Sequence, residues 1–316
     1  MKVLVTGGTG YLGRSIVGAL AGRGHQPVVF ARSASSSGLP GALVDGDVRD
    51  RPALERAAVG CDAICHTAAL VSVWRPRARD FDEVNVGGLE NVLRVAAAHR
   101  ITRVAYTSSF LALPPSDGDA MLRANDYQRT KADARDVALA AIAGGAPLIC
   151  LYPGVIYGPG RQSEGNLIGR MIGDHLRHRL PGLIGADRRW SYAYIDDVAG
   201  GHVSAIERGA PGAEYTLCGE NVPQMRVFEI VRELTKRRLP RRIPFGAANG
   251  IARLEEAKAR VFGFPPLLTR GVVEIFRHEW AYDSERAARE LGYRITPLQE
   301  GIRRTLADLK RADLKM

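Results

Sequence analysis

The sequence predicts an α/β fold in which a doubly wound parallel sheet carries helices on both faces, with a smaller lobe toward the C-terminus. Short apolar runs alternate with helical segments of about 10–15 residues through the first half of the chain, which is the pattern of parallel strands joined by crossover helices. A glycine cluster directly follows the first apolar run and opens a helix. The 316 residues, of which 46% are hydrophobic, suffice for about two domains.

The expected elements of the first half follow one another as strand and helix, with one pair of adjacent strands. Strands are expected over Lys2–Thr6, Pro27–Ala31, Ala42–Asp45, Ala63–Thr67, Arg103–Thr107 and Leu148–Tyr152. Helices are expected over Leu12–Gly24, Pro52–Val59, Asn85–His99 and Tyr127–Ala143. In the third of these helices the apolar residues recur at helical spacing, which indicates one buried face.

The texture of the sequence changes after Gly158, where stretches rich in Gly, Arg and Pro alternate with regular segments. We expect a dinucleotide-binding domain over residues 1–160 and a mainly substrate-binding lobe over residues 161–316. Because the regular segments are interleaved with the irregular ones, a segment near residues 186–210 is expected to return to the first domain.

Charge and composition exclude several classes of protein. Lys and Arg number 44 against 34 Asp and Glu, a net charge of +10, yet the basic residues are scattered among acids, so we expect an electropositive cleft for an anionic ligand and no nucleic-acid partner. No apolar run reaches the ~18 residues of a membrane span, and the N-terminus does not resemble a signal peptide. The 4 cysteines fit neither a disulfide framework nor a zinc site. We therefore expect a cytoplasmic protein without a metal ion.

The glycine cluster predicts a dinucleotide site. Gly7, Gly10 and Gly13 follow the spacing G-x-x-G-x-x-G at the point where the first strand ends and a helix begins. Glycines allow a sharp turn and let backbone N–H groups approach a pyrophosphate, whose charge the helix N-terminus stabilises. A Rossmann-type sheet is the context in which this loop binds a dinucleotide.

The end of the second strand bears on the choice between NAD and NADP. A site for NAD usually has a carboxylate at this position, about 20 residues after the loop, to bind the ribose 2′-hydroxyl. Here Arg32 occupies the position, and Ser33 and Ser35 are nearby. A guanidinium binds a 2′-phosphate bidentately, so NADP(H) is the expected cofactor and NAD(H) the alternative, with Arg32 then only stacking over adenine.

Three residues form a candidate catalytic set. Ser109 follows a strand, and Tyr127 and Lys131 stand four residues apart on an expected helix, hence on one face. An ammonium group near the phenol oxygen would lower the tyrosine pKa from its usual value near ~10, and the serine hydroxyl would bind the same substrate oxygen.

These motifs together resemble the extended short-chain dehydrogenase/reductase family, the superfamily of NAD-dependent epimerases and dehydratases. The segments that carry the resemblance are Thr6–Gly13, Asp47-Val48, His66–Ala69, Asn85–Gly88, Thr107–Ser109, Tyr127 with Lys131, Tyr152–Pro159 and Ile195–Val198. The stretches 106–113, 151–160 and 179–182 are similar to the dihydroflavonol-4-reductase-like branch, and in particular to plant farnesol-dehydrogenase-like proteins.

The resemblance implies a role for each matching residue. Tyr127 would be the general acid/base, Lys131 would lower its pKa and hold the nicotinamide ribose, and Ser109 would polarise the carbonyl. The full set of cofactor contacts that the resemblance implies is Thr6, Gly7, Gly10, Tyr11, Leu12, Gly13, Arg32, Asp47, Val48, Thr67, Ala68, Ala69, Asn85, Thr107, Tyr127, Lys131, Tyr152, Pro153, Gly154 and Val155. Many members have Arg-Pro where this chain has Tyr152-Pro153, which puts in doubt the part of that arginine in binding a nucleotide sugar.

The same Ser-Tyr-Lys set serves reductases, epimerases and dehydratases, so the substrate end must decide between them. The segment after Ser109 has no carboxylate pair, which disfavours dehydration. Apolar residues are expected at the substrate, namely Val71, Trp74, Phe110 and Leu111. They favour an NAD(P)-dependent oxidoreductase that interconverts an apolar or aromatic alcohol and its carbonyl. A nucleotide-sugar epimerase with tightly bound NAD and a non-catalytic dinucleotide-binding protein remain alternatives.

The resemblance also implies a homodimer. Relatives pair the two helices that are expected here over Asn85–His99 and Tyr127–Ala143, and both of these helices have Ala-rich outer faces.

Overall fold

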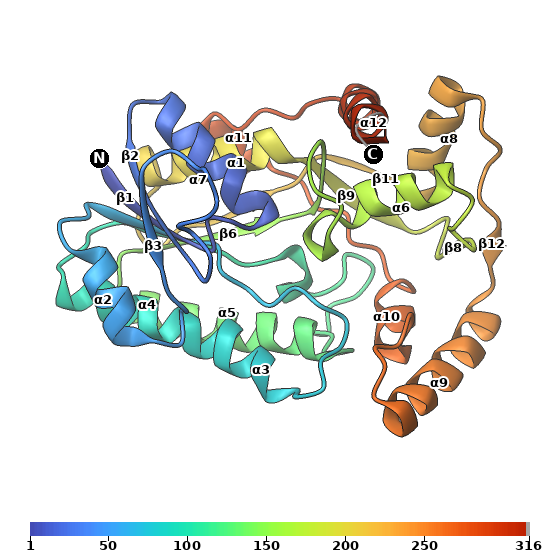
Figure 1. Cartoon of the computed structure of the whole chain (residues 1–316), viewed down its shortest axis with the longest axis horizontal. Coiled ribbons are helices and arrows are strands. Elements are labelled where there is room, and N and C mark those ends of the chain that lie inside the picture. The colour runs from blue at the N-terminus through green and yellow to red at the C-terminus, as the bar shows by residue number, and fades with distance from the viewer. Residues whose placement is uncertain (314–316) are drawn as a thin grey trace.

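The computed structural model describes residues 1–313 and consists of a layered α/β body with a lobe of short sheets and helices beside it (Figure 1). In the described chain seven strands form one parallel sheet in the order β10-β6-β5-β4-β1-β2-β3. Their bounds are β1 (Lys2–Thr6), β2 (Gln26–Ala31), β3 (Ala42–Asp45), β4 (Ala63–His66), β5 (Val104–Thr107), β6 (Leu148–Pro153) and β10 (Glu214–Leu217). The strand order reverses at β1, where a doubly wound sheet opens a crevice at the carboxyl ends of its strands.

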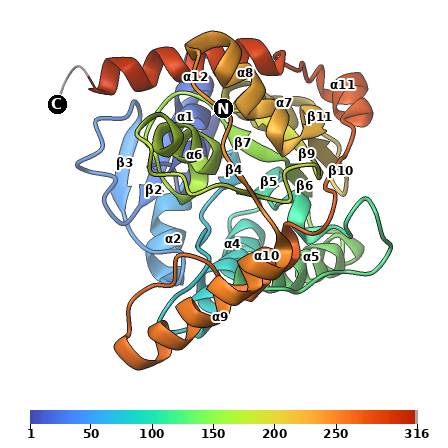
Figure 2. The same ribbon diagram turned by 90° about the vertical axis from the view of Figure 1, so that its right-hand side faces the viewer.

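Helices cover both faces of this sheet, and each face has its own hydrophobic core (Figure 2). One face is covered by α1 (Tyr11–Gly22), α7 (Ile195–Arg208) and α11 (Glu285–Leu291). The other is covered by α2 (Arg51–Ala58), α4 (Gly87–Ala98) and α5 (Asp126–Ala143). Because both faces are buried, the strands are almost continuously apolar, as in the fully buried run of β4.

The predicted fold class, a doubly wound α/β sheet with a smaller C-terminal lobe, is confirmed. Two elements differ from the expectation. The helix expected from Asn85 begins three residues earlier as a π-helical turn (Asp82–Val86), which leads into α4. The sheet also has a seventh strand, β10, so the chain returns to the first body beyond the segment expected near residues 186–210.

The lobe is built on two small sheets and a core rich in aromatic side chains. One sheet consists of β7 (Val155–Tyr157), β9 (Arg189–Tyr194) and β11 (Glu220–Pro223), and the other of β8 (Leu183–Ile184) and β12 (Arg242–Ile243). The helices are α6 (Leu167–Leu176), α8 (Gln224–Thr235), α9 (Phe245–Phe262), α10 (Arg270–Ile275) and α12 (Leu298–Asp313). Strand β9 runs directly into α7, so one continuous segment joins the lobe to the main sheet.

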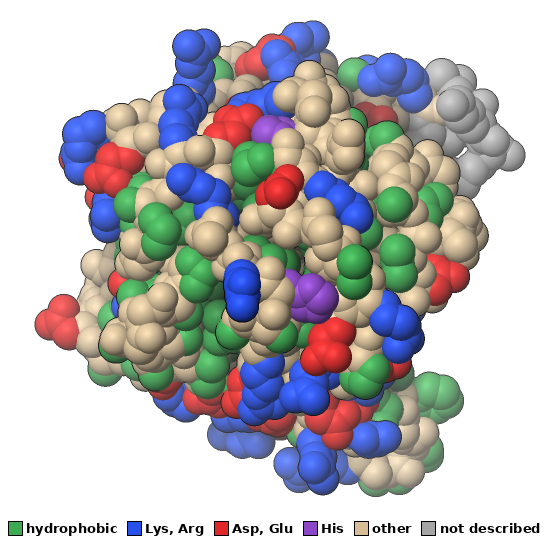
Figure 3. Space-filling view, turned by 90° about the vertical axis from the view of Figure 1, so that its left-hand side faces the viewer, with side chains coloured by type: hydrophobic (Ala, Val, Ile, Leu, Met, Phe, Trp, Pro, Cys, Tyr) green, Lys and Arg blue, Asp and Glu red, His purple; other side chains and the backbone are tan. Residues whose placement is uncertain are grey.

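Short helical turns lie in the loops near the carboxyl ends of the strands: α3 (Arg79–Phe81), η2 (Phe110–Ala112) and η3 (Glu164–Asn166). Among residues 1–313 no helix combines the length and the apolar character that a membrane span needs. On the face shown in Figure 3, basic side chains alternate with acidic ones, as the scattered charges of the sequence predict.

Candidate active site

A cleft of about 680 Å³ opens at the carboxyl ends of the parallel strands. Most of the residues expected to bind the cofactor line it, although they come from segments far apart in the sequence. The lining residues that were expected are Gly7, Gly10, Tyr11, Leu12, Gly13, Arg32, Asp47, Val48, Thr67, Ala68, Ala69, Thr107, Tyr127, Lys131, Pro153, Gly154 and Val155.

The glycine loop has the geometry of a phosphate-binding turn. Gly7 adopts the left-handed region (φ +70°), and its N–H donates to the carbonyl of Phe30 over 2.8 Å. A Cβ on Gly13 would lie 2.2 Å from the carbonyl oxygen of Gly7, so a side chain at that position cannot fit. Within the described chain no side chain caps α1, and its first turn holds no acid. The N–H groups at this helix end can therefore bind an anion, and the loop fits the pyrophosphate of a dinucleotide.

Directly after β2 the cleft is lined by Arg32, which is exposed and has no ion pair with any residue of the described chain. Asp47 is held by Arg49 through two bonds of 2.8 and 3.0 Å, which lower the pKa of its carboxyl. The hydroxyl of Ser35, expected near a 2′-phosphate, instead donates to Asp45 over 2.6 Å. Of these two arginines, Arg49 is paired with Asp47 and Arg32 has no ion pair, although its charge also lowers the pKa of the Asp47 carboxyl. Arg75 likewise lines the cleft without an ion pair to a described residue.

The three candidate catalytic residues converge on one wall of the cleft. Tyr127 and Lys131 stand in the first turns of α5, and Ser109 precedes η2, where its hydroxyl accepts the N–H of Leu111 over 3.2 Å. The ammonium group of Lys131, whose side chain is buried, donates to the carbonyl of Thr107 over 3.0 Å. The carbonyl at the end of β5 thereby fixes where the ammonium group lies.

Burial is the main electrostatic influence on this wall. It raises the pKa of Tyr127 to about 12, while hydrogen bonding with Ser109 acts in the opposite direction. It lowers the pKa of Lys131 to about 8. At neutral pH the tyrosine is therefore a phenol with a proton to donate, and the lysine is mostly charged. A lowering of the tyrosine pKa by Lys131 stays a prediction.

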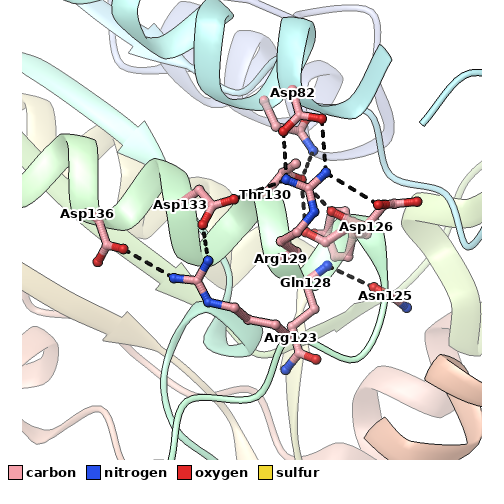
Figure 4. Close-up of polar contacts among 11 residues, drawn as sticks. Asp82, Arg123, Asn125, Asp126, Gln128, Arg129, Thr130, Asp133 and Asp136 are labelled. Atoms are coloured by element: carbon pink, nitrogen blue, oxygen red, sulfur yellow. Dashed lines mark hydrogen bonds and ion pairs between the residues drawn. The ribbon is translucent and has the colours of Figure 1, made fainter. Parts of the chain in front are cut away.

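A network of ion pairs anchors the start of α5 (Figure 4). Arg129 binds both carboxylate oxygens of Asp82, at 2.7 and 2.9 Å, and also contacts Asp133 at 3.2 Å. Arg123 binds Asp133 and lies 3.4 Å from Asp136. Because these residues join α5 to the π-helical turn and to the preceding loop, they hold the helix that carries Tyr127.

The comparisons with known proteins agree with this geometry. Residues 3–218 match the NAD dependent epimerase/dehydratase family. The chain belongs to that family. It is 31% identical to the 2-alkyl-3-oxoalkanoate reductase of Stenotrophomonas maltophilia, over 97% of this chain and 99% of that protein. It is 32% identical to sterol demethylase protein B of Methylococcus capsulatus, over 92% and 93%. The crystal structure of gox2253 is similar, with a TM-score of 0.83, 28% identity and 98% of each chain covered.

This family member is an NAD(P)-dependent oxidoreductase of the extended short-chain dehydrogenase/reductase type. Apolar side chains line the end of its cleft at which the sequence predicts the substrate. The expected Val71, Phe110 and Leu111 line this end. Three residues that were not predicted from the sequence as substrate contacts also line it, namely Ile156, Leu167 and Trp190. The ring of Phe110 lies edge-on to that of Trp190, with centroids 6.0 Å apart. An aromatic wall of this kind suits an apolar substrate.

One expected substrate residue lies elsewhere. Trp74 lines a second cavity, of about 740 Å³, between its own loop and α9. In the same loop, the Ser72 hydroxyl donates to Glu164 in η3 over 3.1 Å, and Glu164 lines the main cleft. A loop with no regular spacing offers no sequence signal for which of its residues will face the cleft.

Three expected cofactor residues support the cleft without lining it. The Thr6 hydroxyl bonds to His66 Nδ1 over 2.7 Å. Asn85 accepts the N–H of Leu70 over 2.7 Å and donates to the hydroxyl of Thr130 over 3.0 Å.

The third of these residues, Tyr152, has its hydroxyl bonded to Glu214 and to Arg135, on the side of β6 that carries α5. Alternation along β6 accounts for this, because Pro153 faces the cleft and its neighbour must then face away.

Proposed function

We propose that this chain is a carbonyl reductase/alcohol dehydrogenase that uses NADP(H) to interconvert an apolar or aromatic alcohol and its carbonyl compound. The observation that carries the proposal is the meeting of Ser109, Tyr127 and Lys131 between the glycine loop and the apolar end of one cleft. The similarity to a protein named 2-alkyl-3-oxoalkanoate reductase supports carbonyl reduction. The finer resemblance to plant farnesol-dehydrogenase-like proteins stays a prediction.

The residues of the wall divide the chemistry between them. When bound, the nicotinamide supplies a hydride to the carbonyl carbon or accepts one from the alcohol carbon. In the direction of reduction, Ser109 donates a hydrogen bond to the substrate oxygen and Tyr127 donates its proton to that oxygen, which completes the alcohol. Lys131, held by the Thr107 carbonyl, places a positive charge beside the phenolate that remains. Oxidation uses the same groups in reverse, with Tyr127 as the base.

A turnover assay tests this proposal directly. The purified protein is given apolar and aromatic carbonyl compounds and alcohols with either nicotinamide cofactor, and the nicotinamide absorbance is followed. A stoichiometric change in that absorbance with substrate is expected. Equilibration of UDP-glucose and UDP-galactose without net change of the cofactor would instead identify an epimerase. Cofactor binding without turnover of any of these substrates would identify a non-catalytic protein.

The preference for NADP(H) rests on Arg32, the unpaired cation that faces the cleft near the end of β2. The Arg32→Ala variant should bind NADPH about tenfold to a hundredfold more weakly and NADH about as well as the parent does, because one charge-assisted contact to the 2′-phosphate is lost. Titration of both cofactors at fixed salt measures this. A matched control is Arg94→Ala, which removes an exposed arginine of α4 that pairs with Glu90. If the variant bound NADPH and NADH more weakly by the same factor, the proposed preference for NADP(H) would be contradicted.

We further propose a homodimer that pairs α4 and α5 of two copies. Sedimentation at micromolar concentration tests it, and a monomer there would contradict it.

A further inference from the structure

We propose that α9 and the loop after it form a surface that binds anionic lipid membranes, beside the substrate end of the cleft. This surface, the α9 projection, consists of residues 251–267. Figures 1 and 2 show α9 extending away from the body at the lower edge of the molecule.

Large apolar side chains are exposed along the α9 projection. With about 3.6 residues per turn, Ile251, Leu254 and Val261 lie on one side of the helix. Phe262 at the end of α9, and Phe264 and Leu267 in the loop after it, have exposed fractions of 66%, 71% and 90%. Such a patch marks an interaction surface in a folded protein, because water disfavours exposed apolar area.

Small side chains attach α9 to the rest of the lobe. Ala248, Ala252 and Ala259 are the buried residues of this helix, and the first two pack with Val273 of α10 in a small separate core. Phe245, in the first turn of α9, also packs against this core. In the α9 projection itself, however, the large apolar side chains are exposed while Ala252 and Ala259 are buried, which is the reverse of a helix that only completes a core.

The charges of the α9 projection favour binding to an anionic lipid surface over binding to an uncharged apolar partner. Arg253 and Arg260 are exposed and have no ion pair among residues 1–313. The acids of the helix are already paired, Glu255 with Lys258 at 3.0 Å and Glu256 with Arg270 at 2.8 Å. Exposed phenylalanine and leucine flanked by unneutralised arginines is the composition of a helix that lies in a lipid headgroup layer.

Three of the four arginines that line the second cavity are engaged by carboxylates. Arg123 and Arg129 are held by Asp133 of α5 (Figure 4), and Arg270 is held by Glu256, whereas the fourth, Arg260, belongs to the α9 projection. The cavity does show that the α9 projection adjoins the loop of Trp74. Because Leu70 and Val71 of that loop line the main cleft, contact with a membrane would bring the substrate end of the cleft close to the lipid.

Vesicle sedimentation of the full chain, without substrate or cofactor, tests the proposal. The wild type should bind phosphatidylcholine vesicles that contain phosphatidylglycerol, bind vesicles of phosphatidylcholine alone more weakly, and lose binding as salt screens the charges. Replacing the exposed tip (Phe262→Ser, Phe264→Ser, Leu267→Ser) should lower the partition coefficient on the order of tenfold or more. A matched control removes three exposed apolar residues elsewhere (Val59→Ser, Leu234→Ser, Ile295→Ser) and should bind as the wild type does.

A second variant, Arg253→Glu with Arg260→Glu, keeps the apolar tip and should lose the preference for phosphatidylglycerol. Circular dichroism must show that each variant is folded. The proposal fails if the wild type does not sediment with anionic vesicles or if the tip variant binds as well as the wild type. It fails equally if the tip instead mediates self-association, seen as an oligomer that the tip variant dissociates and that ignores vesicles. Since no turnover is measured, these outcomes are independent of the proposed reaction.

Discussion

The two ends of the cleft are built in different ways. The glycine-loop end comes from one stretch of chain, Val3–Gly13, in which strand, turn and helix follow directly and the binding groups are backbone N–H groups. The substrate end is assembled from separate loops, among them the one that contains Val71 and the one that contains Glu164, and from Trp190 of β9. The first end is therefore specified by local sequence and the second by how distant segments pack.

The catalytic wall lies between these ends and differs from both in its electrostatics. It buries both an ammonium group, whose pKa falls to about 8, and a phenol, whose pKa rises to about 12. Buried charge opposes folding, whereas the glycine loop opposes it mainly through backbone entropy. Substitutions in the three regions should consequently affect different measurements.

Tyr127→Phe should have the largest effect. Removing the proton donor at the wall should lower kcat by roughly 10²–10⁴-fold while cofactor binding and stability change little. Steady-state turnover and cofactor titration measure the two quantities. The control is Tyr152→Phe, which removes a buried hydroxyl that faces away from the cleft. Comparable losses in both variants would mean that the chemistry does not lie at this wall.

Lys131→Met should show how much the buried charge of the catalytic wall lowers the free energy of unfolding, because methionine keeps a long apolar side chain without the charge. The folded pKa of Lys131, about 8, is below its usual 10.5, so between these values the unfolded state binds more protons and stability rises with pH. Below pH 8 the buried charge opposes folding by an amount on the order of 3 kcal/mol. The variant should therefore have a higher free energy of unfolding at pH 7 than the wild type.

The difference between the two proteins should shrink as the pH rises from 8 to 10.5. Urea unfolding over this range measures it. A constant difference at all pH values would show that the pKa of Lys131 is the same in the folded and unfolded states, and hence that burial does not lower it.

Gly13→Ala tests the local character of the glycine-loop end. The added Cβ would meet the Gly7 carbonyl oxygen at 2.2 Å, so the turn must shift, at a cost of about 1–3 kcal/mol. Cofactor affinity should fall at least about tenfold, because the N–H groups move with the turn. Gly18→Ala in the same helix has no atom within 4 Å of its added Cβ and should be neutral or stabilising. Thermal unfolding and cofactor titration distinguish the two variants.

Ser72→Ala should have the smallest effect, and it should change only the binding of the substrate. It removes the bond from Ser72 to Glu164 that joins two loops, so KM should rise about threefold with the cofactor affinity unchanged. The control is Ser163→Ala, next to Glu164 in the chain, because the Ser163 side chain makes no capping hydrogen bond within the described chain. A matching change in cofactor affinity would mean that the two ends of the cleft are coupled.

Strong local signals were enough for much of the fold. The strands at Lys2–Thr6 and Ala42–Asp45 have the predicted bounds, because turn residues flank their apolar runs. The seventh strand, β10, was not assigned to the main sheet, since pairing with β6 is a long-range choice that a short run does not reveal. The exposed α9 projection likewise depends on which face of a helix the rest of the lobe covers.

By itself, the sequence determined the α/β class, the glycine loop and the helical spacing of Tyr127 and Lys131, because each depends on residues close together in the chain. Tertiary structure decided that Tyr152 and Trp74 lie outside the main cleft and that Trp190 lies inside it. It also decided the electrostatics of the wall, since the pKa of Lys131 depends on burial by segments that the sequence keeps far apart. Contact and solvent exclusion are properties of the packed chain, and no local pattern encodes them alone.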